Sequence, residues 1–250
     1  MAYRDEKLSL ILIFTERNDC LKLKITDLIV EIDIKGKLLE SRIAPYIYEG
    51  DRETDIVSVV SEQFYRDRNE EHKHLSFDEC EYLYSGSFFY EQLALYNGLM
   101  LHSSCVEYKG KAYLFSAPSG TGKSTHTHLW LKYLPDCRII NDDKPAIRII
   151  DGVAYAYGTP WSGKTDENVN EGVPIGGICF LSRGENKIKR IPGIMALKLF
   201  MEQTVRPADK VLMNKMLETL NIILTNIPIY QMTCDMSEDA VKTAVEGMVR

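Results

Sequence analysis

The sequence has no excess of positive charge. Its 250 residues include 30 lysine and arginine residues against 36 aspartate and glutamate residues, a formal net charge of −6. Nucleic-acid-binding domains usually carry a basic stripe or patch, so we expect no nucleic-acid partner. Hydrophobic residues at 45% and charged residues at 26% are ordinary for a globular protein with a sizeable core.

The sequence also lacks paired cysteines. Its six cysteines are scattered, and none belongs to a C-x-x-C pair. This spacing argues against a zinc site and against a dense disulfide framework. We expect free, mostly buried thiols in a reducing cytoplasm.

No hydrophobic run near the N-terminus is long enough to span a bilayer. The run from Leu8 to Phe14 is too short, and residues 15–19, which follow it, do not resemble a signal-peptide cleavage site of small residues. We therefore expect a buried strand at 8–14 and a cytoplasmic protein without a membrane partner.

The strongest positive signal lies between residues 112 and 134. An apolar run, 112–115, precedes a loop of small residues, and a segment with helical character, 125–134, follows. The loop matches the phosphate-binding pattern G-x-x-x-x-G-K-[ST] except at its first position, which is alanine. An ordinary glycine-rich turn before a helix is the alternative interpretation. The residues expected to contact a nucleotide are Ala117, Pro118, Ser119, Gly120, Thr121, Gly122, Lys123, Ser124 and Thr125.

Each part of this loop has a chemical purpose. Small residues let the backbone wrap an anion with its N–H groups pointing inward, and the helix N-terminus behind them adds partial positive charge. Lys123 would reach the terminal phosphates, and the Ser124 hydroxyl would take one place on Mg²⁺. We expect ATP or GTP, together with Mg²⁺, as the ligand.

The remaining pattern predicts an α/β protein. Alternating apolar residues over 21–40, interrupted by the glycine at 36, indicate a small, largely antiparallel β unit. The charge-dense stretch 66–74 is expected to be an exposed connection, and 88–99 has helical spacing. Further strands are expected at 101–108, 111–115, 138–141, 146–150, 153–157, 175–181 and 229–233, and helices at 194–203, 208–225 and after the N-cap Ser237.

Two adjacent carboxylates, Asp142 and Asp143, end the strand that follows the helix of the loop. A carboxylate at such a strand end can hold Mg²⁺ against nucleotide phosphates. Adjacent residues of a strand point to opposite faces, so both can face one site only where the strand is ending. One would then bind the metal and the other accept a proton; a solvated acidic turn is the alternative.

His102 opens the strand before the loop. Two strands joined by the tight turn at Lys109-Gly110 would bring His102 back near the loop or beyond it. A lone histidine is usually a structural residue, so spacing alone leaves its role open.

Residues 158–174 are polar and irregular, as functional loops inside compact domains often are. The tetrapeptide 162–165 imitates a second phosphate loop, but we reject that reading because no strand and helix frame it. An exposed Trp161 and Lys164 in this loop would instead grip the phosphate acceptor by stacking and charge. A tryptophan packed under the loop is the alternative.

These residues together resemble a known family. The run from Gly110 to Thr125, with His102 before it and Ile140-Asn141-Asp142-Asp143 after it, is similar to the catalytic domain of HPr kinase/phosphorylase. The resemblance covers roughly residues 100–182. The family shares a fold group with phosphoenolpyruvate carboxykinase and transfers phosphate from a nucleotide to a serine hydroxyl. The resemblance implies that Lys123 and Ser124 serve phosphate and Mg²⁺, that one aspartate is the general base, and that His102 assists it.

Two departures from the family pattern bear on the acceptor. The N-terminal domain of full-length HPr kinases is not recognisable in residues 1–99, and the glycine-rich signature after the hairpin is replaced by residues 158–162. The chain is more similar to stand-alone HPr-kinase-like proteins, some of which phosphorylate serine in peptides destined for modification.

We therefore expect an HPr kinase/phosphoenolpyruvate carboxykinase-like P-loop domain with a mixed sheet and C-terminal helices at residues 100–250. A β-rich unit with a connecting helix is expected at 1–99. The expected function is Mg²⁺-dependent transfer of the γ-phosphate to serine of a peptide or protein, with His102, Lys123, Asp142 and Asp143 as catalytic residues and Ser124 and Asp142 as metal ligands. A nucleotide sensor without kinase activity and a kinase of a free small molecule remain alternatives. The sequence leaves a homo-oligomer open.

Overall fold

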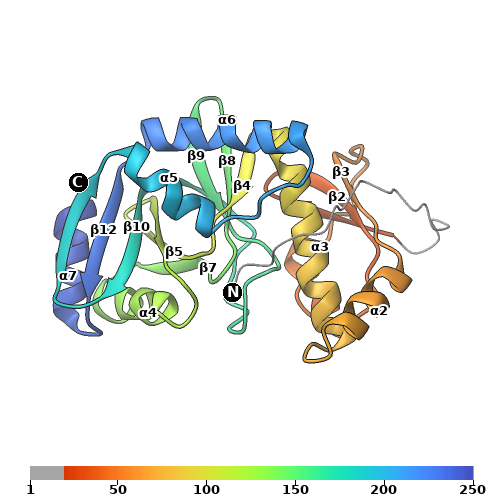
Figure 1. Ribbon diagram of the computed structural model, residues 1–250, viewed down its shortest axis with the longest axis horizontal. Helices are drawn as coiled ribbons and strands as arrows, with labels where there is room; N and C mark the ends of the chain where they lie inside the picture. The colour runs from red at the N-terminus through yellow and green to blue at the C-terminus, as the bar shows by residue number, and fades with distance from the viewer. Residues whose placement is uncertain (1–19, 250) are drawn as a thin grey trace.

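The computed structural model describes residues 20–249, so the strand expected at 8–14 lies outside the described residues. A small three-stranded sheet precedes a large, curled mixed sheet, and helices follow it (Figure 1). The α/β class is confirmed. Within this part of the chain, no helix combines the length and the apolar character needed to cross a membrane.

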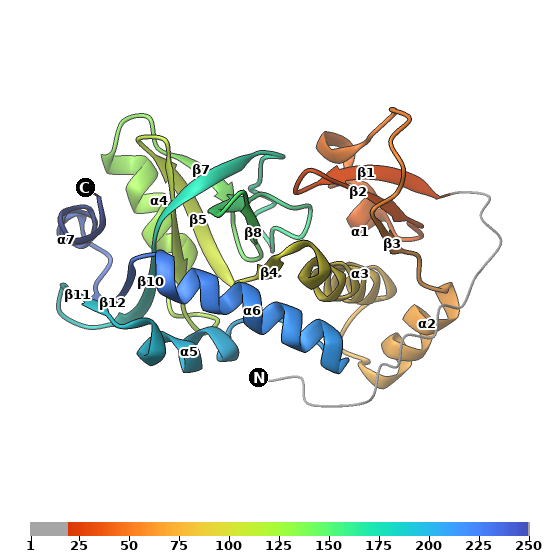
Figure 2. The ribbon, with the colours of Figure 1, turned by 90° about the horizontal axis from the view of Figure 1, so that it is seen from above.

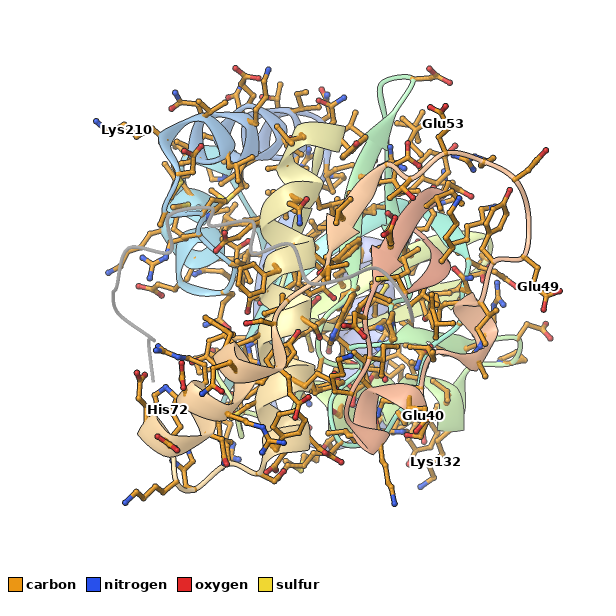
Figure 3. The ribbon with its side chains drawn as sticks, turned by 90° about the vertical axis from the view of Figure 1, so that its right-hand side faces the viewer. Glu40, Glu49, Glu53, His72, Lys132 and Lys210 are labelled. Carbon is orange, nitrogen blue, oxygen red and sulfur yellow. The ribbon has the colours of Figure 1, made fainter. Side chains whose placement is uncertain are left out.

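The N-terminal unit is a sheet packed against a long helix. Strand β1 pairs antiparallel with β2, and β2 pairs parallel with β3. Charged side chains such as Glu40, Glu49 and Glu53 point outward from this end of the molecule (Figure 3). The elements of the unit are β1 (Leu21–Ile25), β2 (Leu28–Ile32), α1 (Lys37–Glu40), the 3₁₀ turn η1 (Ala44–Tyr46), β3 (Ile56–Ser58), α2 (Glu62–Glu71), α3 (Phe77–Leu93) and the 3₁₀ turn η2 (Ala94–Tyr96).

Three sequence-based predictions in this unit differ from the structure, although residues 66–74 are exposed or half-buried and part of 88–99 is helical. The hairpin turns at Thr26-Asp27, both with positive φ, and Gly36 instead precedes α1. The stretch 66–74 is not a plain connection, because α2 extends to residue 71 behind the N-cap Ser61. The helix expected at 88–99 begins earlier, where Ser76 forms a capping box, and it ends before strand β4.

The large sheet has the strand order β4-β8-β9-β10-β6-β5-β7, and β12 pairs with β10 and β11 beside this path. The central pair, β6 and β10, is parallel, and β12 runs parallel to β10 as well. Their carboxyl ends therefore share one edge of the sheet. The strands are β4 (Gly98–Met100), β5 (Ser103–Tyr108), β6 (Lys111–Ser116), β7 (Arg138–Asn141), β8 (Ala146–Ile150), β9 (Val153–Tyr157), β10 (Gly172–Arg183), β11 (Lys187–Ile191) and β12 (Ile229–Cys234).

Helices cover both faces of this sheet, α4 and α7 on one side and α5 and α6 on the other (Figure 2). A hydrophobic core lies on each face of the sheet, and alternate residues of β6 point into one or the other. Leu114 packs towards α5 and α6, whereas Tyr113 and Phe115 pack around Trp130 of α4. This alternation is the period-two pattern of a strand buried on both faces. The helices are α4 (Lys123–Tyr133), α5 (Gly193–Glu202), α6 (Lys210–Asn226) and α7 (Glu238–Met248).

A third core joins the small sheet to the large one. It combines residues of β1–β3 and α3 with Tyr157 of β9 and Trp161, which follows β9. The N-terminal unit therefore packs directly on the segment that leaves the β8–β9 hairpin. The domain boundary expected between residues 99 and 100 stays a prediction.

Candidate functional site

The loop that joins β6 to α4 contains two glycines with left-handed backbone angles. Gly120 and Gly122 have φ values of +77° and +117°, which side-chain-bearing residues rarely adopt. A Cβ added at Gly120 would meet nothing within 4 Å. The loop begins at the buried Ala117, exposes residues 118–120, and ends where Lys123 opens α4. The sequence-predicted strand–loop–helix arrangement is present.

Lys123 lies behind this loop. Its side chain is only 8% exposed, and its Nζ donates a hydrogen bond of 3.1 Å to the carbonyl of Ala117. Burial lowers the pKa of Lys123, and the charges of Asp143 and Asp142 oppose that effect. Lys123, Asp142 and Asp143, three of the four residues predicted to be catalytic, therefore lie close enough for their charges to interact.

Asp142 is held at the mouth of the loop by two hydroxyl groups. Ser124 Oγ donates to its Oδ1 at 2.9 Å, and Thr165 Oγ1 donates to its Oδ2 at 3.0 Å. The backbone N–H of Asp142 donates to the carbonyl of Glu167 at 2.9 Å. The sequence predicted the closeness of Ser124 and Asp142, but it gave no signal for Thr165.

This arrangement suits Mg²⁺ bound together with a nucleotide. A serine hydroxyl and a carboxylate are the hard oxygen ligands that Mg²⁺ prefers, and the ion usually completes its octahedron with phosphate oxygens and waters. Among residues 20–249, no group of three or more His, Cys, Asp or Glu side chains is arranged to hold a metal ion. Ser124 and Asp142 would supply two oxygen ligands, and phosphate oxygens and waters would supply the others.

Asp143 has different partners from its neighbour. His102 Nε2 lies 3.0 Å from Oδ1, and Lys144 Nζ lies 2.6 Å from Oδ2. Because a carboxylate only accepts, Nε2 carries the hydrogen in this bond. On the far side of the ring, His102 Nδ1 lies 2.9 Å from the side-chain oxygen Oε1 of Gln203, which follows α5; because this oxygen only accepts, a hydrogen bond there needs a hydrogen on Nδ1 as well. The side chain of Gln203 thus fixes the orientation of the imidazole.

These partners determine the charge of Asp143. Burial alone would raise the pKa of Asp143, but the hydrogen bond from His102 and the charge of Lys144 hold it far below its usual value. The carboxylate is therefore ionised throughout the physiological range. Its φ of +88° is a positive value that aspartate tolerates better than most residues, and it turns Asp143 out of the strand direction.

The segment 158–171 lies directly against the two aspartates. A Cβ on Gly163 would stand 2.7 Å from Cβ of Asp143, so a side chain at this position would displace Asp143 or the backbone of the segment. Arg42 Nη1 donates to the Gly163 carbonyl at 2.6 Å, and the Tyr82 hydroxyl accepts from the Gly163 N–H at 2.9 Å. Two residues of the N-terminal unit thus hold the backbone that contacts Asp143. No sequence pattern near Arg42 or Tyr82 predicts these contacts.

The prediction that Trp161 is exposed and contacts the acceptor is wrong. Trp161 is fully buried, its ring stacks on Phe89 at 5.1 Å between centroids, and its Nε1 donates to Ser85 Oγ at 3.2 Å. A large ring of this kind gains more from burial against α3 than from exposure. Lys164 is exposed, as expected, on the same segment.

No family model and no curated protein matches this chain. Among solved structures, the chain is similar to the Hpr(Ser) kinase/phosphatase from Coxiella burnetii, with a TM-score of 0.37 and 9% sequence identity. The match covers 59% of this chain and 93% of that chain. The likeness is a weak resemblance of fold and carries no argument about activity.

Proposed function

We propose that this protein is an Mg²⁺-dependent phosphotransferase that moves the γ-phosphate of ATP or GTP to a hydroxyl group. One observation carries the proposal: two adjacent carboxylates beside the loop have separate partners. Asp142 bonds to the loop serine Ser124, and Asp143 bonds to His102. Adjacent acids with such different environments are typical of sites that divide metal binding from proton transfer.

The donor nucleotide would bind over the N-terminus of α4. The amides of residues 118–123 would surround the β-phosphate, and Lys123 would leave the Ala117 carbonyl to contact the β and γ oxygens. Ser124 and Asp142 would hold Mg²⁺, which neutralises the charge that develops on the phosphates during transfer.

Asp143 would serve the acceptor. The acceptor oxygen forms a bond to the γ-phosphorus while the bond from that phosphorus to the β–γ bridging oxygen breaks, and the nucleoside diphosphate leaves with the electron pair. The hydroxyl proton passes to the Asp143 carboxylate. Because the pKa of Asp143 is low, its main contribution is to orient the hydroxyl, and the proton moves late, when the attacking oxygen has become acidic.

His102 and Gln203 would position Asp143 without contacting the substrate. The expected acceptor, a serine of a peptide or protein, rests on the family resemblance of the sequence. The exposed segment around Lys164 lies beside Asp143, and we propose that such a peptide lies on it.

The test compares Asp142→Asn with Asp143→Asn. Calorimetry measures Mg²⁺·ATP affinity, and label from the γ-phosphate is followed into a pool of serine-containing peptides, into glycerol and into water. Asp143→Asn is expected to lower transfer by roughly 10²–10⁴ with nucleotide affinity kept, whereas Asp142→Asn is expected to weaken Mg²⁺·ATP binding itself. Full transfer by both variants would overturn the proposal, and nucleotide binding without transfer to any acceptor would favour a sensor.

A further inference from the structure

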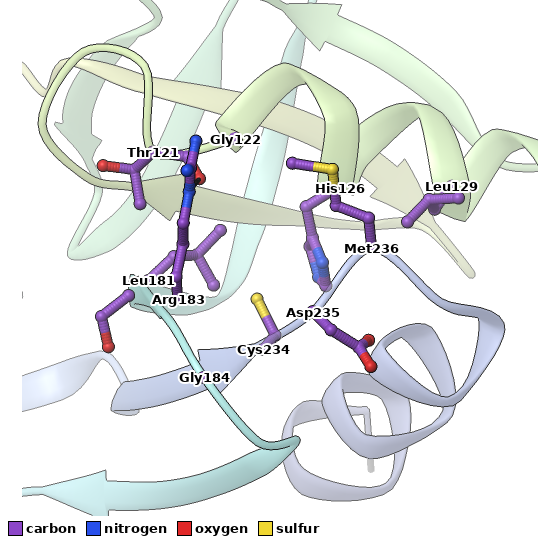
Figure 4. Close-up of a pocket in the computed structure, with 11 residues that line it drawn as sticks. Thr121, Gly122, His126, Leu129, Leu181, Arg183, Gly184, Cys234, Asp235 and Met236 are labelled. Atoms are coloured by element: carbon purple, nitrogen blue, oxygen red, sulfur yellow. Dashed lines mark hydrogen bonds between the residues drawn. The ribbon is translucent and has the colours of Figure 1, made fainter.

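A cavity of about 310 Å³ opens beside the 117–125 loop and is not used by the proposed chemistry (Figure 4). Thr121 and Gly122 of the loop form one wall, and the carboxyl ends of β10 and β12 form another. Such crevices at the carboxyl ends of parallel strands are where open α/β sheets bind ligands. A volume of this size lies at the lower end of small-molecule sites, roughly 300–1,000 Å³.

One wall of the cavity carries a buried donor that lacks a partner. His126 descends from α4, is 3% exposed, and accepts the indole N–H of Trp130 on its Nε2 at 3.1 Å. Because an indole nitrogen only donates, Nε2 carries no hydrogen, and the hydrogen of the neutral ring is on Nδ1. No partner for Nδ1 exists within residues 20–249. Buried donors are normally paired, so this one calls for an acceptor.

Apolar side chains form another part of the lining. Leu129 of α4 and Leu181 of β10 line the cavity, and Met236 closes it from the segment after β12. Met236 is 58% exposed, and its Cε lies 3.5 Å from the position of a Cβ on Gly122. An exposed thioether against a glycine of the loop leaves a flexible surface on which a flat ring can stack. Figure 4 shows His126, which comes from α4, and Met236, which comes from the segment after β12, among the residues that line the cavity.

Asp235 adds an ionised acceptor at the rim. The hydroxyl of Ser237 and the amide of Asn186 donate to it and lower the pKa of its carboxyl group. The cavity thus combines apolar side chains, a histidine whose covered Nδ1–H has no partner among the described residues, and one anionic acceptor, all next to the 117–125 loop.

We propose that this cavity binds the purine base of the nucleotide, with His126 Nδ1–H donating to a ring nitrogen or carbonyl of the base and Met236 packing on its face. The exocyclic or ring N–H groups of the base donate to Asp235. The inference rests on the proposed function, because the phosphates must occupy the 117–125 loop for the base to reach the cavity. Arg183 donates a hydrogen bond of 2.7 Å to the Gly120 carbonyl. It thereby holds the part of the loop that lies between the proposed phosphate site and the proposed base site.

The test separates base from phosphates by comparing three Mg²⁺ complexes, those of ATP, GTP and inorganic tripolyphosphate, in calorimetry. The variants are His126→Gln, whose Oε1 still accepts from Trp130, and Met236→Ala at the exposed position. Met195→Ala, on α5 and also 58% exposed, is the matched control. The wild type is expected to bind at least one purine triphosphate more than about tenfold tighter than tripolyphosphate. Each test variant is expected to lose about two- to tenfold in that ratio with tripolyphosphate affinity unchanged.

The outcomes distinguish the two proposals. If tripolyphosphate binds as tightly as ATP and GTP, or if the ratio survives in Met236→Ala and His126→Gln, the base pocket is refuted while the phosphate site stands. If no complex binds, the proposed function fails and the inference with it. Loss of the ratio in Met195→Ala as well would also overturn the assignment, because the effect would then not belong to the cavity.

Discussion

Two tetrapeptides of nearly the same sequence occupy opposite sides of the candidate site. Thr121-Gly122-Lys123-Ser124 opens α4, whereas Ser162-Gly163-Lys164-Thr165 lies in a segment without regular structure. Lys123 is buried behind the 117–125 loop, and Lys164 is exposed. The two nevertheless meet, because the hydroxyls of Ser124 and Thr165 bond to the two oxygens of one carboxylate, Asp142.

The difference between them lies in what holds each in place. The first segment is shaped locally by the strand before it, the helix after it and glycines with positive φ. The second is shaped by distant partners: Arg42 and Tyr82 bond to Gly163, and Trp161 is buried against α3. The same residue types therefore stand in two different settings: we propose that the first binds phosphate, whereas Gly163 of the second lies against Asp143.

Removing Trp161 gives the sharpest test of this long-range support. Trp161→Ala deletes a fully buried ring stacked on Phe89, and we expect it to lower the free energy of unfolding by about 3–5 kcal/mol in urea titrations. The exposed Lys164→Ala is expected to change stability by less than about 0.5 kcal/mol. A stable Trp161→Ala protein that had lost only phosphate transfer would restore Trp161 as an acceptor contact.

The two lysines should differ most in nucleotide binding. Lys123→Ala is expected to weaken Mg²⁺·ATP by about 10- to 100-fold, the equivalent of a lost hydrogen bond between charged groups. Lys164→Ala is expected to leave the affinity unchanged, because its side chain is exposed and does not line the loop. Calorimetry measures both. Equal losses in the two variants would show that the tetrapeptides share one role.

The two glycines Gly163 and Gly110 allow a matched test of crowding near Asp143. Their φ values are +72° and +71°, so alanine strains both backbones equally, by about 1 kcal/mol. At Gly110 the new methyl group meets nothing within 4 Å, whereas at Gly163 it collides with Asp143.

We therefore expect Gly163→Ala to lose about 1–3 kcal/mol of stability and much of its phosphate transfer, with Mg²⁺·ATP affinity kept. Gly110→Ala should lose only the stability that corresponds to the strained backbone, about 1 kcal/mol. Urea titration and the transfer assay distinguish the two. Identical behaviour of both variants would mean that Asp143 does not depend on the 158–171 segment.

The sequence could predict the conformation of the 117–125 loop because this conformation depends on residues that are close together along the chain. A strand, a glycine-rich turn and a helix are consecutive, and the strand end at Asp142-Asp143 follows from short-range pattern. The charge-dense α2 was also within reach: Ser61 caps it, and Arg66 pairs with Glu62 four residues earlier. The high charge density of residues 66–74 led to the prediction of a connection, although these two helix signals are present in the sequence.

The second segment could not be predicted, since its determinants are long-range. Gln203 orients His102, although the two residues are far apart in the sequence, and no pattern near either residue predicts the contact. The burial of Trp161 depends on Gly86 of α3, where a Cβ would stand 2.9 Å from the indole. Such complementarity arises from tertiary packing, which overrides the usual expectation that a polar loop exposes its tryptophan.

The smallest expected effect comes from an ion pair between α4 and the 158–171 segment. His128 Nε2 lies 2.9 Å from Glu167. Burial alone would lower the pKa of His128, but the hydrogen bond and charge of Glu167 outweigh it and raise the pKa above its usual value. A raised pKa means that the folded state binds the proton more tightly. The stabilisation is therefore complete below the unfolded-state pKa of about 6.5 and disappears as the pH rises through the folded-state pKa.

His128→Gln should accordingly lower the free energy of unfolding at pH 5.5 and leave it unchanged at pH 9. The side chains of His128 and Glu167 are 44% and 34% exposed, so solvent screening limits the difference to less than about 0.5 kcal/mol. Urea unfolding at the two pH values measures the difference, NMR titration gives the pKa of His128 directly, and 1 M salt at pH 5.5 should shrink the effect. A His128 pKa at or below that of an unfolded peptide would show that the two sides of the site are joined at Asp142 and not through this pair.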